Sequence, residues 1–181
     1  MKTSSAETLA PASSLALDEA GFEAFHARTS RALWGYLRRI GGGPEAADDA
    51  LQEAYLRILT HPPTPESDER TRKAYLYRIA TNLVRDRWRH SERERLGLDR
   101  FLIHLTSRNR SRDADARLDF GEAFHQLPSR DRALLWLAHV EGYEHREIAG
   151  ILGLKEGSIR VLLFRARQRL AQIMKKEETG R

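Results

Sequence analysis

The sequence predicts an all-α protein built from two small helical domains joined by a flexible linker. Apolar residues recur three and four positions apart along most of the 181 residues, whereas the two-residue alternation of strands is missing. Clusters of glycine and proline separate these stretches, as helix breaks do. The expected boundaries are a disordered tail at 1–17, a first domain at 18–95, a linker at 96–117, a second domain at 118–176 and a short tail at 177–181.

Three helices are expected in the first domain. The first ends at the glycines of positions 41–43, and its core-facing stripe is Phe22, Phe25, Leu33, Leu37 and Ile40. The second, "PEAADDALQEAYLRILT", begins at Pro44, which suits the first turn of a helix, and places acidic residues near the positive N-terminal end. The prolines at positions 62, 63 and 65 then open a loop, "HPPTPESDERTR", before the third helix.

The third helix contains "AYLYRIATNLVRDRWRH", residues 74–90, which mixes aromatics, arginines and one asparagine. At about 100° per residue, its apolar face is formed by Leu76, Ile79, Ala80 and Leu83. The opposite face carries Arg78, Asn82, Arg85 and Arg89, and one border carries Tyr77, Thr81 and Trp88. A solvated cationic face with aromatics at its edge is one interpretation, and a nucleic-acid surface is the other.

Residues 91–117 lose the helical pattern and are dense in charge at both ends. A short apolar island, Phe101 to Leu105, interrupts them. Two interpretations stay open for the island: a short helix packed on one domain, or a segment that inserts into a partner.

The overall composition narrows the class of protein. With Lys+Arg 31 against Asp+Glu 26, the formal net charge is +5 and the pI about 9.8, which favours polyanionic partners such as nucleic acid. The absence of cysteine excludes disulfides and thiolate metal sites and suits a reducing compartment. No apolar run has the length of a signal peptide core or a membrane span, so a cytoplasmic protein is expected.

A helix-turn-helix is predicted within "HREIAGILGLKEGSIRVLLFRARQRL", residues 145–170. Ala149 supplies the small residue that the crossing of the two helices needs, and Gly153 supplies the turn between them. Leu154, Ile159 and Leu163 would hold the second helix against the domain. In such motifs the second helix enters the major groove of DNA.

The second helix of this motif has an outward face that could read base edges. Placing Ile159, Leu163, Ala166 and Leu170 inward turns outward Ser158, Val161, Arg165, Gln168 and Arg169, with Arg160, Phe164 and Arg167 toward one flank. Arginine can bind guanine bidentately, and an apolar side chain can meet a thymine methyl group. The alternative is a packed helical hairpin with a solvated basic face.

Beside such a domain, the third helix suits single-stranded DNA, because its arginines can grip phosphates and its aromatics can stack on exposed bases. One module for duplex DNA and one for unpaired DNA together indicate promoter opening. The chain resembles a sigma-70 family initiation factor of the compact extracytoplasmic-function (ECF) group. The likeness covers roughly residues 20–95 and 118–174, a sigma-2-like and a sigma-4-like domain. "ADDALQEAYLRIL" resembles the helix that docks on the clamp helices of the RNA polymerase β′ subunit. "AYLYRIATNLVRDRWR" resembles the −10 reader, and the region from "LPSRDRALLWL" onward resembles the −35 reader.

The resemblance implies roles for individual residues. The positions that match the polymerase-binding interface are Asp49, Gln52, Glu53 and Arg57. Asn82 matches the position that contacts a base flipped from the non-template strand, with the loop from Pro62 to Arg72 cradling that base. Arg78, Arg85 and Trp88 are expected to support the backbone or the domain. The −10 candidates also include Tyr77 and Arg89.

The resemblance also implies which residues meet the −35 duplex. The matching positions are Arg160, Val161, Phe164 and Arg165, and the outward face adds Ser158 and Arg169. Relatives often carry serine and arginine where this chain has Val161 and Leu162. The loss of these polar groups shifts specificity or weakens base contacts, so the promoter sequence is not inferred from that of relatives. The second domain is expected to dock near the β flap, and an anti-sigma factor is a further partner that the family allows.

Two rival classes were weighed against this interpretation. A helix-turn-helix regulator that binds duplex DNA as a dimer without polymerase accounts for the second domain alone. An enzyme finds little support, because the seven histidines are scattered and no nucleophile is paired with a base. We therefore expect no catalytic residues, no metal and no cofactor.

Overall fold

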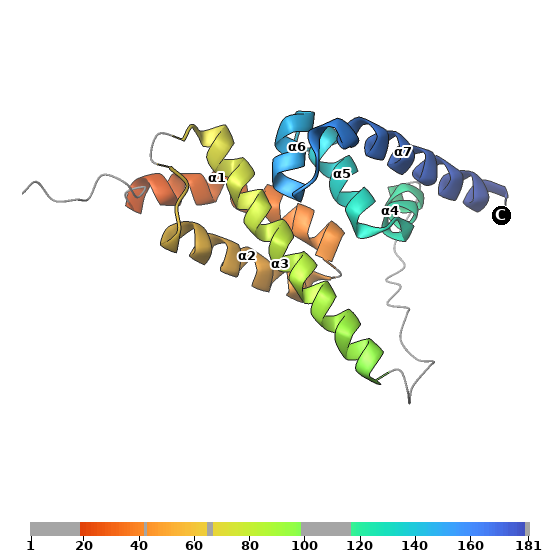
Figure 1. Cartoon of the computed structure of the whole chain (residues 1–181), viewed down its shortest axis with the longest axis horizontal. Helices are drawn as coiled ribbons and strands as arrows, with labels where there is room; N and C mark the ends of the chain where they lie inside the picture. Colours follow the sequence, from red (N-terminus) through yellow and green to blue (C-terminus); the bar gives the residue numbers. More distant parts are fainter. Residues whose placement is uncertain (1–18, 42, 65–66, 99–116, 180–181) are drawn as a thin grey trace, which may run out of the picture.

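The structure, a computed structural model, describes residues 19–41, 43–64, 67–98 and 117–179. Seven helices occur in this part of the chain, and no strand occurs among the described residues, which confirms the all-α prediction. The helices are α1 (Glu19–Gly41), α2 (Pro44–Thr60), α3 (Glu69–Leu98), α4 (Arg117–Gln126), α5 (Ser129–His139), α6 (His145–Leu152) and α7 (Glu156–Thr179). Helices α1–α3 form one group and α4–α7 a second (Figure 1).

The first group is held by an apolar core that the three helices share. Leu37 and Ile40 of α1, Ala50 of α2, and Leu76 and Ala80 of α3 are all buried there. Small alanines on α2 let it lie close to its neighbours, since the helix–helix distance depends on the side chains at the contact. The core-facing stripes predicted for the first and third helices are thus confirmed, with Phe22 and Ile79 only partly buried.

Helix α3 is longer than the sequence pattern indicated. It begins after Asp68, whose Oδ1 accepts a hydrogen bond of 2.7 Å from the backbone N–H of Thr71, a typical N-cap arrangement. Hydrogen bonding from the Thr71 side chain, and then from its backbone N–H, holds the pKa of the Asp68 carboxyl below its ordinary value. The last four residues expected in the loop are therefore helical, and the helix continues to Leu98, past the expected start of the linker at residue 96.

The second group contains the predicted helix-turn-helix, formed by α6 and α7. Gly153 ends α6 with a φ of 63°, and the next residue, Leu154, donates its backbone N–H to the carbonyl of Ala149 at 2.9 Å. At the other end of α6, the Glu147 side chain accepts from the backbone N–H of Glu144 at 2.7 Å, closing a capping box. Both ends of this short helix are therefore fixed locally.

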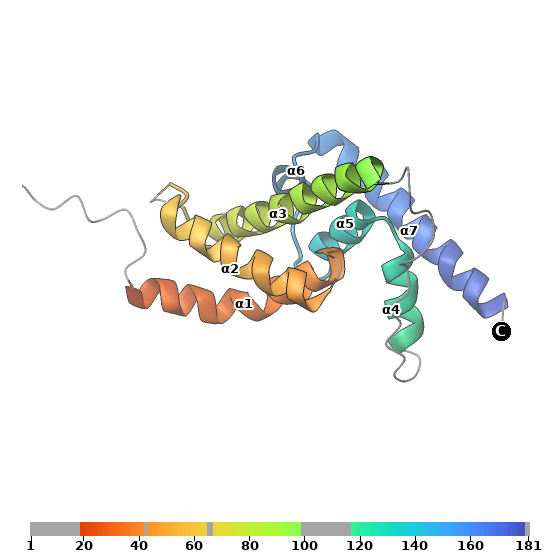
Figure 2. The same ribbon diagram turned by 90° about the horizontal axis from the view of Figure 1, so that it is seen from below.

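The two groups are packed against each other along α3. Helix α6 lies beside α3, and α5 lies beside α1, as Figures 1 and 2 show from two directions. The ring of Tyr143, which precedes α6, is edge-on to that of Tyr77 with centroids 5.8 Å apart, so one apolar core runs through both domains. The expected tail at 1–17 and the apolar island at 101–105 lie outside the described residues.

The turn at Gly153 provides a test of local stability. Gly153→Ala should destabilise the protein by about 1–2 kcal/mol, because a side chain is disfavoured at its positive φ. A Cβ there would meet only Arg85 Nη1 at 3.9 Å, an ordinary contact, so the cost is conformational. The matched control is Gly150→Ala, within α6 in open space, which should stabilise by about 0.5–1 kcal/mol. Urea unfolding followed by circular dichroism measures both, and equal effects would contradict the argument.

Candidate nucleic-acid interface

Helix α3 presents an exposed polar face opposite its buried one. Arg78 and Asn82 are exposed, whereas Leu76, Ala80 and Leu83 are buried. An asparagine side chain offers both a donor and an acceptor, which suits the edge of an unpaired base. The two strongest −10 candidates of the sequence are therefore on the surface and one turn apart.

Tyr77 requires a correction, because it is not at the surface of α3. It is fully buried between the rings of Tyr36 and Tyr143, whose centroids lie 5.1 and 5.8 Å away. Burial raises the pKa of its phenol far above the ordinary value, so the group is neutral. The prediction that Tyr77 lies at the border and can stack on a base is wrong for this conformation, since Tyr143 covers it.

Arg85 is exposed, but its guanidinium is engaged. Nη1 donates to the backbone carbonyl of Leu152, at the end of α6, over 3.1 Å. The other two −10 candidates, Trp88 and Arg89, belong to α3. Their side chains fall outside the described part of the structure.

The outward face of α7 combines apolar and basic side chains. Val161 and Phe164 are 48% and 55% exposed, and Arg160 and Arg165 are exposed beside them. Ile159, Leu163 and Ala166 are buried beneath, as the sequence predicted. Large apolar groups held in water at the start of this helix suit contact with thymine methyl groups.

Two of the −35 candidates also serve within the domain. Ser158 is half-buried and its hydroxyl donates to the carbonyl of Lys155 at 3.0 Å, in the first turn of α7. Arg169 is half-exposed, and its Nη1 donates to Asp131 of α5, whose carboxylate is almost completely buried. This ion pair joins α7 to α5, so the structure gives Arg169 a structural contact that the sequence did not predict.

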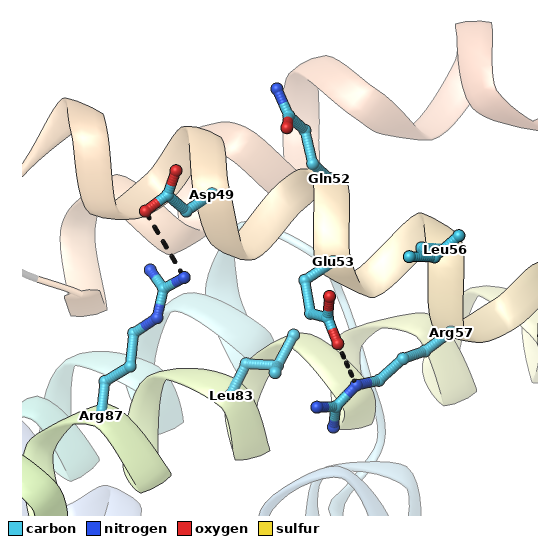
Figure 3. A pocket seen from close by; sticks show the side chains of 7 residues that line it. All are labelled: Asp49, Gln52, Glu53, Leu56, Arg57, Leu83 and Arg87. Carbon is cyan, nitrogen blue, oxygen red and sulfur yellow. Dashed lines mark hydrogen bonds and ion pairs between the residues drawn. The ribbon is translucent and has the colours of Figure 1, made fainter.

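A third surface lies on α2, where an open hollow of about 400 Å³ is lined by all four residues that the sequence assigned to polymerase binding (Figure 3). These are Asp49, Gln52, Glu53 and Arg57. All three charges among them are paired: Arg57 Nε lies 2.7 Å from Glu53, one turn away, and Arg87 of α3 lies 3.6 Å from Asp49.

The sequence analysis missed the apolar part of this surface. Leu56 lines the hollow and is 57% exposed, and Leu59 beside it is 49% exposed. Both leucines lie outside the buried face of α2. An apolar residue on the otherwise polar face of a helix is the sequence signal that could have identified them. Exposed leucines rimmed by polar side chains are typical of a surface that binds another protein.

Metal-binding clusters and membrane-spanning helices were both sought among the described residues. Within 19–41, 43–64, 67–98 and 117–179, no three His, Cys, Asp or Glu side chains gather closely enough to hold a metal ion. None of the helices in the same part of the chain is long and apolar enough to cross a membrane.

Two family models match the chain, one on each domain. The model described as Sigma-70 region 2 matches residues 25–94, which span most of α1 through most of α3. The model described as Sigma-70, region 4 matches residues 117–170, which begin with α4 and include the helix-turn-helix. The exposed faces of α3 and α7 therefore fall one in each matched region.

Curated relatives agree with these models. The ECF RNA polymerase sigma factor SigD of Mycobacterium bovis is 32% identical over 148 residues, covering 79% of this chain and 68% of that protein. The ECF RNA polymerase sigma factor SigL of Mycobacterium tuberculosis is 26% identical over 154 residues, covering 83% and 87%.

Solved structures agree on the fold. The sigma factor RpoE of Bartonella quintana, in complex with the anti-sigma factor NepR, matches with a TM-score of 0.68 and 22% identity over 85% of this chain and 96% of that one. CnrH, in complex with the cytosolic domain of CnrY, matches with a TM-score of 0.61 and 24% identity over 88% and 90%.

Fold and surfaces thus define a two-domain helical transcription factor with a sigma-type region in each domain. The chain belongs to the extracytoplasmic-function group of the sigma-70 family.

The Arg169–Asp131 contact separates structural from DNA-binding arginines on α7. Arg169→Gln should lower the free energy of unfolding by roughly 1–3 kcal/mol, because it removes the hydrogen-bonded cation from the buried Asp131 carboxylate and leaves only Arg130, whose Nε lies 3.9 Å away. Arg165→Gln, on the exposed face of the same helix, should change it by less than about 0.5 kcal/mol. Thermal or urea unfolding of both variants checks this; equal losses would show that Asp131 does not depend on Arg169.

Proposed function

We propose that this protein directs promoter-specific transcription initiation as a sigma factor that binds core RNA polymerase. The main support for the proposal is that one chain presents two separate exposed faces suited to DNA, on α3 and α7, and a third surface on α2. Each lies in the sigma region that the family resemblance expects for it.

In the proposed mechanism, α2 docks on the clamp helices of the β′ subunit. Leu56 supplies apolar contact to that surface, and Asp49 and Glu53, each paired with an arginine, line the same hollow. Paired charges at the rim add specificity of fit more than affinity. The second domain docks near the β flap, which places both DNA-reading helices on one enzyme.

The −10 element is captured as unpaired DNA by α3. Asn82 reads the edge of a base that has left the stack, while Arg78, exposed one turn earlier, contacts phosphate. Strand opening in this scheme is driven by binding energy, and the polymerase performs the bond chemistry.

The −35 element is read as duplex by α7. Arg160 and Arg165 contact phosphate or guanine, and Val161 and Phe164 meet thymine methyl groups. An anti-sigma partner is part of the proposal, because RpoE of Bartonella quintana, which shares this fold, was solved with one.

The test of this function reconstitutes transcription. Purified protein is mixed with sigma-free bacterial core polymerase and genomic DNA fragments, and the 5′ ends of the transcripts are sequenced. Discrete starts that share two upstream elements are expected. Binding to DNA without polymerase, and no new starts, would instead favour the dimeric helix-turn-helix regulator.

Asn82→Ala should reduce open-complex formation at those promoters while leaving polymerase binding nearly unchanged, because Asn82 is exposed on α3 and lies outside the α2 hollow. Permanganate footprinting measures the opened DNA, and gel filtration with core polymerase serves as the control. Normal opening by the variant would remove Asn82 from the −10 interface.

Arg165→Ala should weaken −35 recognition by about 1–3 kcal/mol if the guanidinium reads a base. The measurement compares the affinity of the holoenzyme for the cognate −35 sequence with its affinity for a scrambled one. An equal loss on both sequences would make Arg165 a phosphate contact.

A further inference from the structure

Asp131 is an acidic side chain in the interior of the second domain. It lies in the first turn of α5, its backbone N–H donates to the carbonyl of Pro128 at 2.9 Å, and only 1% of the residue is exposed. The positive N-terminal end of a helix favours a carboxylate in this turn. A buried carboxylate also needs a hydrogen-bonding cation, because an unpaired charge is costly away from water.

Helix α7 supplies that cation from its outer surface. Nη1 of Arg169 donates to Oδ2 of Asp131, whereas Arg130 Nε lies 3.9 Å from Oδ1, too far for a hydrogen bond. Arg169 is four residues after Arg165, so the two arginines lie on the same row of α7, about 6 Å apart along its axis. The ion pair therefore acts on the row that carries a proposed base-reading arginine.

The other contacts that hold α7 in its domain are apolar. Ile159, Leu163 and Ala166 are buried in the core, and the helix packs against α4, α5 and α6. Apolar burial is non-directional, so it holds the helix down but constrains rotation about its axis only weakly. A hydrogen bond weakens steeply when its angle or length changes. The bond between Asp131 and Arg169 thus adds a directional constraint on that rotation.

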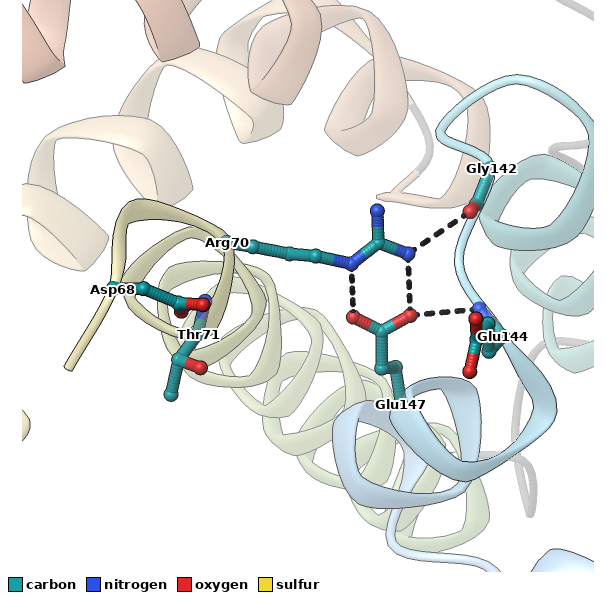
Figure 4. A network of polar contacts seen from close by, with 6 residues as sticks. All are labelled: Asp68, Arg70, Thr71, Gly142, Glu144 and Glu147. Carbon is teal, nitrogen blue, oxygen red and sulfur yellow. Dashed lines mark hydrogen bonds and ion pairs between the residues drawn. The ribbon is translucent and has the colours of Figure 1, made fainter.

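The neighbouring carboxylates of the domain face α3 instead (Figure 4). The two carboxylate oxygens of Glu147 in α6 accept from Nε and Nη2 of Arg70, over 2.5 and 2.7 Å. Glu141, just past α5, lies 2.9 Å from Lys73 Nζ. These acids attach α6 and the end of α5 to α3, whereas Asp131 acts on α7 within its own domain.

A small rotation of α7 is enough to disturb contacts with bases. Side chains at the surface of a helix lie about 5–6 Å from its axis, so a rotation of roughly 10° displaces them by about 1 Å. Bidentate binding of guanine by arginine requires two hydrogen bonds of good length at the same time. A displacement of this size breaks at least one of them, so the rotation of α7 bears directly on base recognition.

We propose that Asp131 is a positioning residue for −35 recognition, setting through Arg169 the rotation of α7 that brings Arg165 and Val161 to the base edges. The inference rests on the proposed function, which supplies the DNA contact. Because Asp131 is buried, it touches no DNA, and any effect of its substitution on base reading passes through α7. Arg169 then serves the −35 interface through Asp131, without contacting a base or a phosphate itself.

The affinity of the holoenzyme for promoters with the cognate and with a scrambled −35 element tests this role. Asp131→Ala and Arg169→Ala remove the acceptor and the donor without adding a new polar group. Each should lower the cognate-to-scrambled affinity ratio by about fivefold or more, the lower end of what one bidentate base contact contributes. The double variant should lose no more than either single one, because both act through one contact. Arg169→Lys, which keeps the charge, should recover part of the ratio.

Charge-matched controls are Glu122→Ala, exposed on α4, and Lys175→Ala, exposed near the end of α7. They should change both affinities alike and leave the ratio as it is. All variants are compared at a temperature at which circular dichroism shows them folded, since lost stability lowers both affinities together. Should Asp131→Ala fail to fold, the two Arg169 variants provide the same comparison from the exposed side of the pair.

Two outcomes of the affinity measurement would overturn the proposal. One is an unchanged ratio in the folded Asp131 and Arg169 variants. The other is an equal loss on both sequences in Arg169→Ala with no loss in Asp131→Ala, which would make Arg169 a phosphate contact. A wild-type holoenzyme without any −35 preference would instead refute the proposed function.

The orientation of α7 is also measured without polymerase or DNA. Residual dipolar couplings of the backbone amides in the full-length protein report how α7 is turned relative to α5 and α6. The controls should fit the wild-type arrangement, whereas Asp131→Ala should require a rotated or more variable α7. Unchanged couplings of α7 in Asp131→Ala would overturn the positioning role, whether or not the protein initiates transcription.

Discussion

The rest of the structure depends on one constraint, the limited number of side-chain rows on the surface of α3. A helix has room for only a few side-chain rows, and α3 contacts its own domain, the second domain and solvent with different rows. Leu76 and Ala80 belong to the shared core, Arg70 and Lys73 to the ion pairs with the second domain, and Asn82 to the exposed face. The exposed row can remain polar because the other two rows attach α3 to its own domain and to the second domain.

Two of the three surfaces resemble each other in construction. On α2 and on α7, large apolar side chains stand in water among charged ones: Leu56 beside the Glu53–Arg57 pair, and Phe164 beside Arg165. Isolated apolar groups of this size gain free energy when a partner covers them, while the charges around them limit self-association. In the proposed function, charge complementarity selects a protein surface for α2 and a polyanion for α7.

Much of this arrangement was predictable from local patterns in the sequence. Helical spacing placed the buried residues of α7, and the glycine at position 153 marked its turn, because both follow from the geometry of one helix and its cap. The exposed position of Asn82 follows from the same spacing. The lengths of the helices were less predictable, because the charged residues that extend α3 show no apolar periodicity that would indicate a helix.

The errors share a physical origin in contacts between residues distant in the chain. A helical wheel assigns one buried face, and Tyr77 was placed beside it because nothing in the wheel represents Tyr143, which covers Tyr77 from another domain. Arg169 does point away from the core stripe of α7, yet Asp131, 38 positions earlier, meets it. Periodicity carries no information about such partners.

Helix α5 connects two of the features described above. Asp131, in its first turn, holds Arg169 of α7, and Glu141, just past its last turn, holds Lys73 of α3. Helix α5, which connects these two ion pairs, is about 16 Å long. The same short helix therefore carries both the ion pair that fixes α7 within its domain and the ion pair that joins this domain to α3.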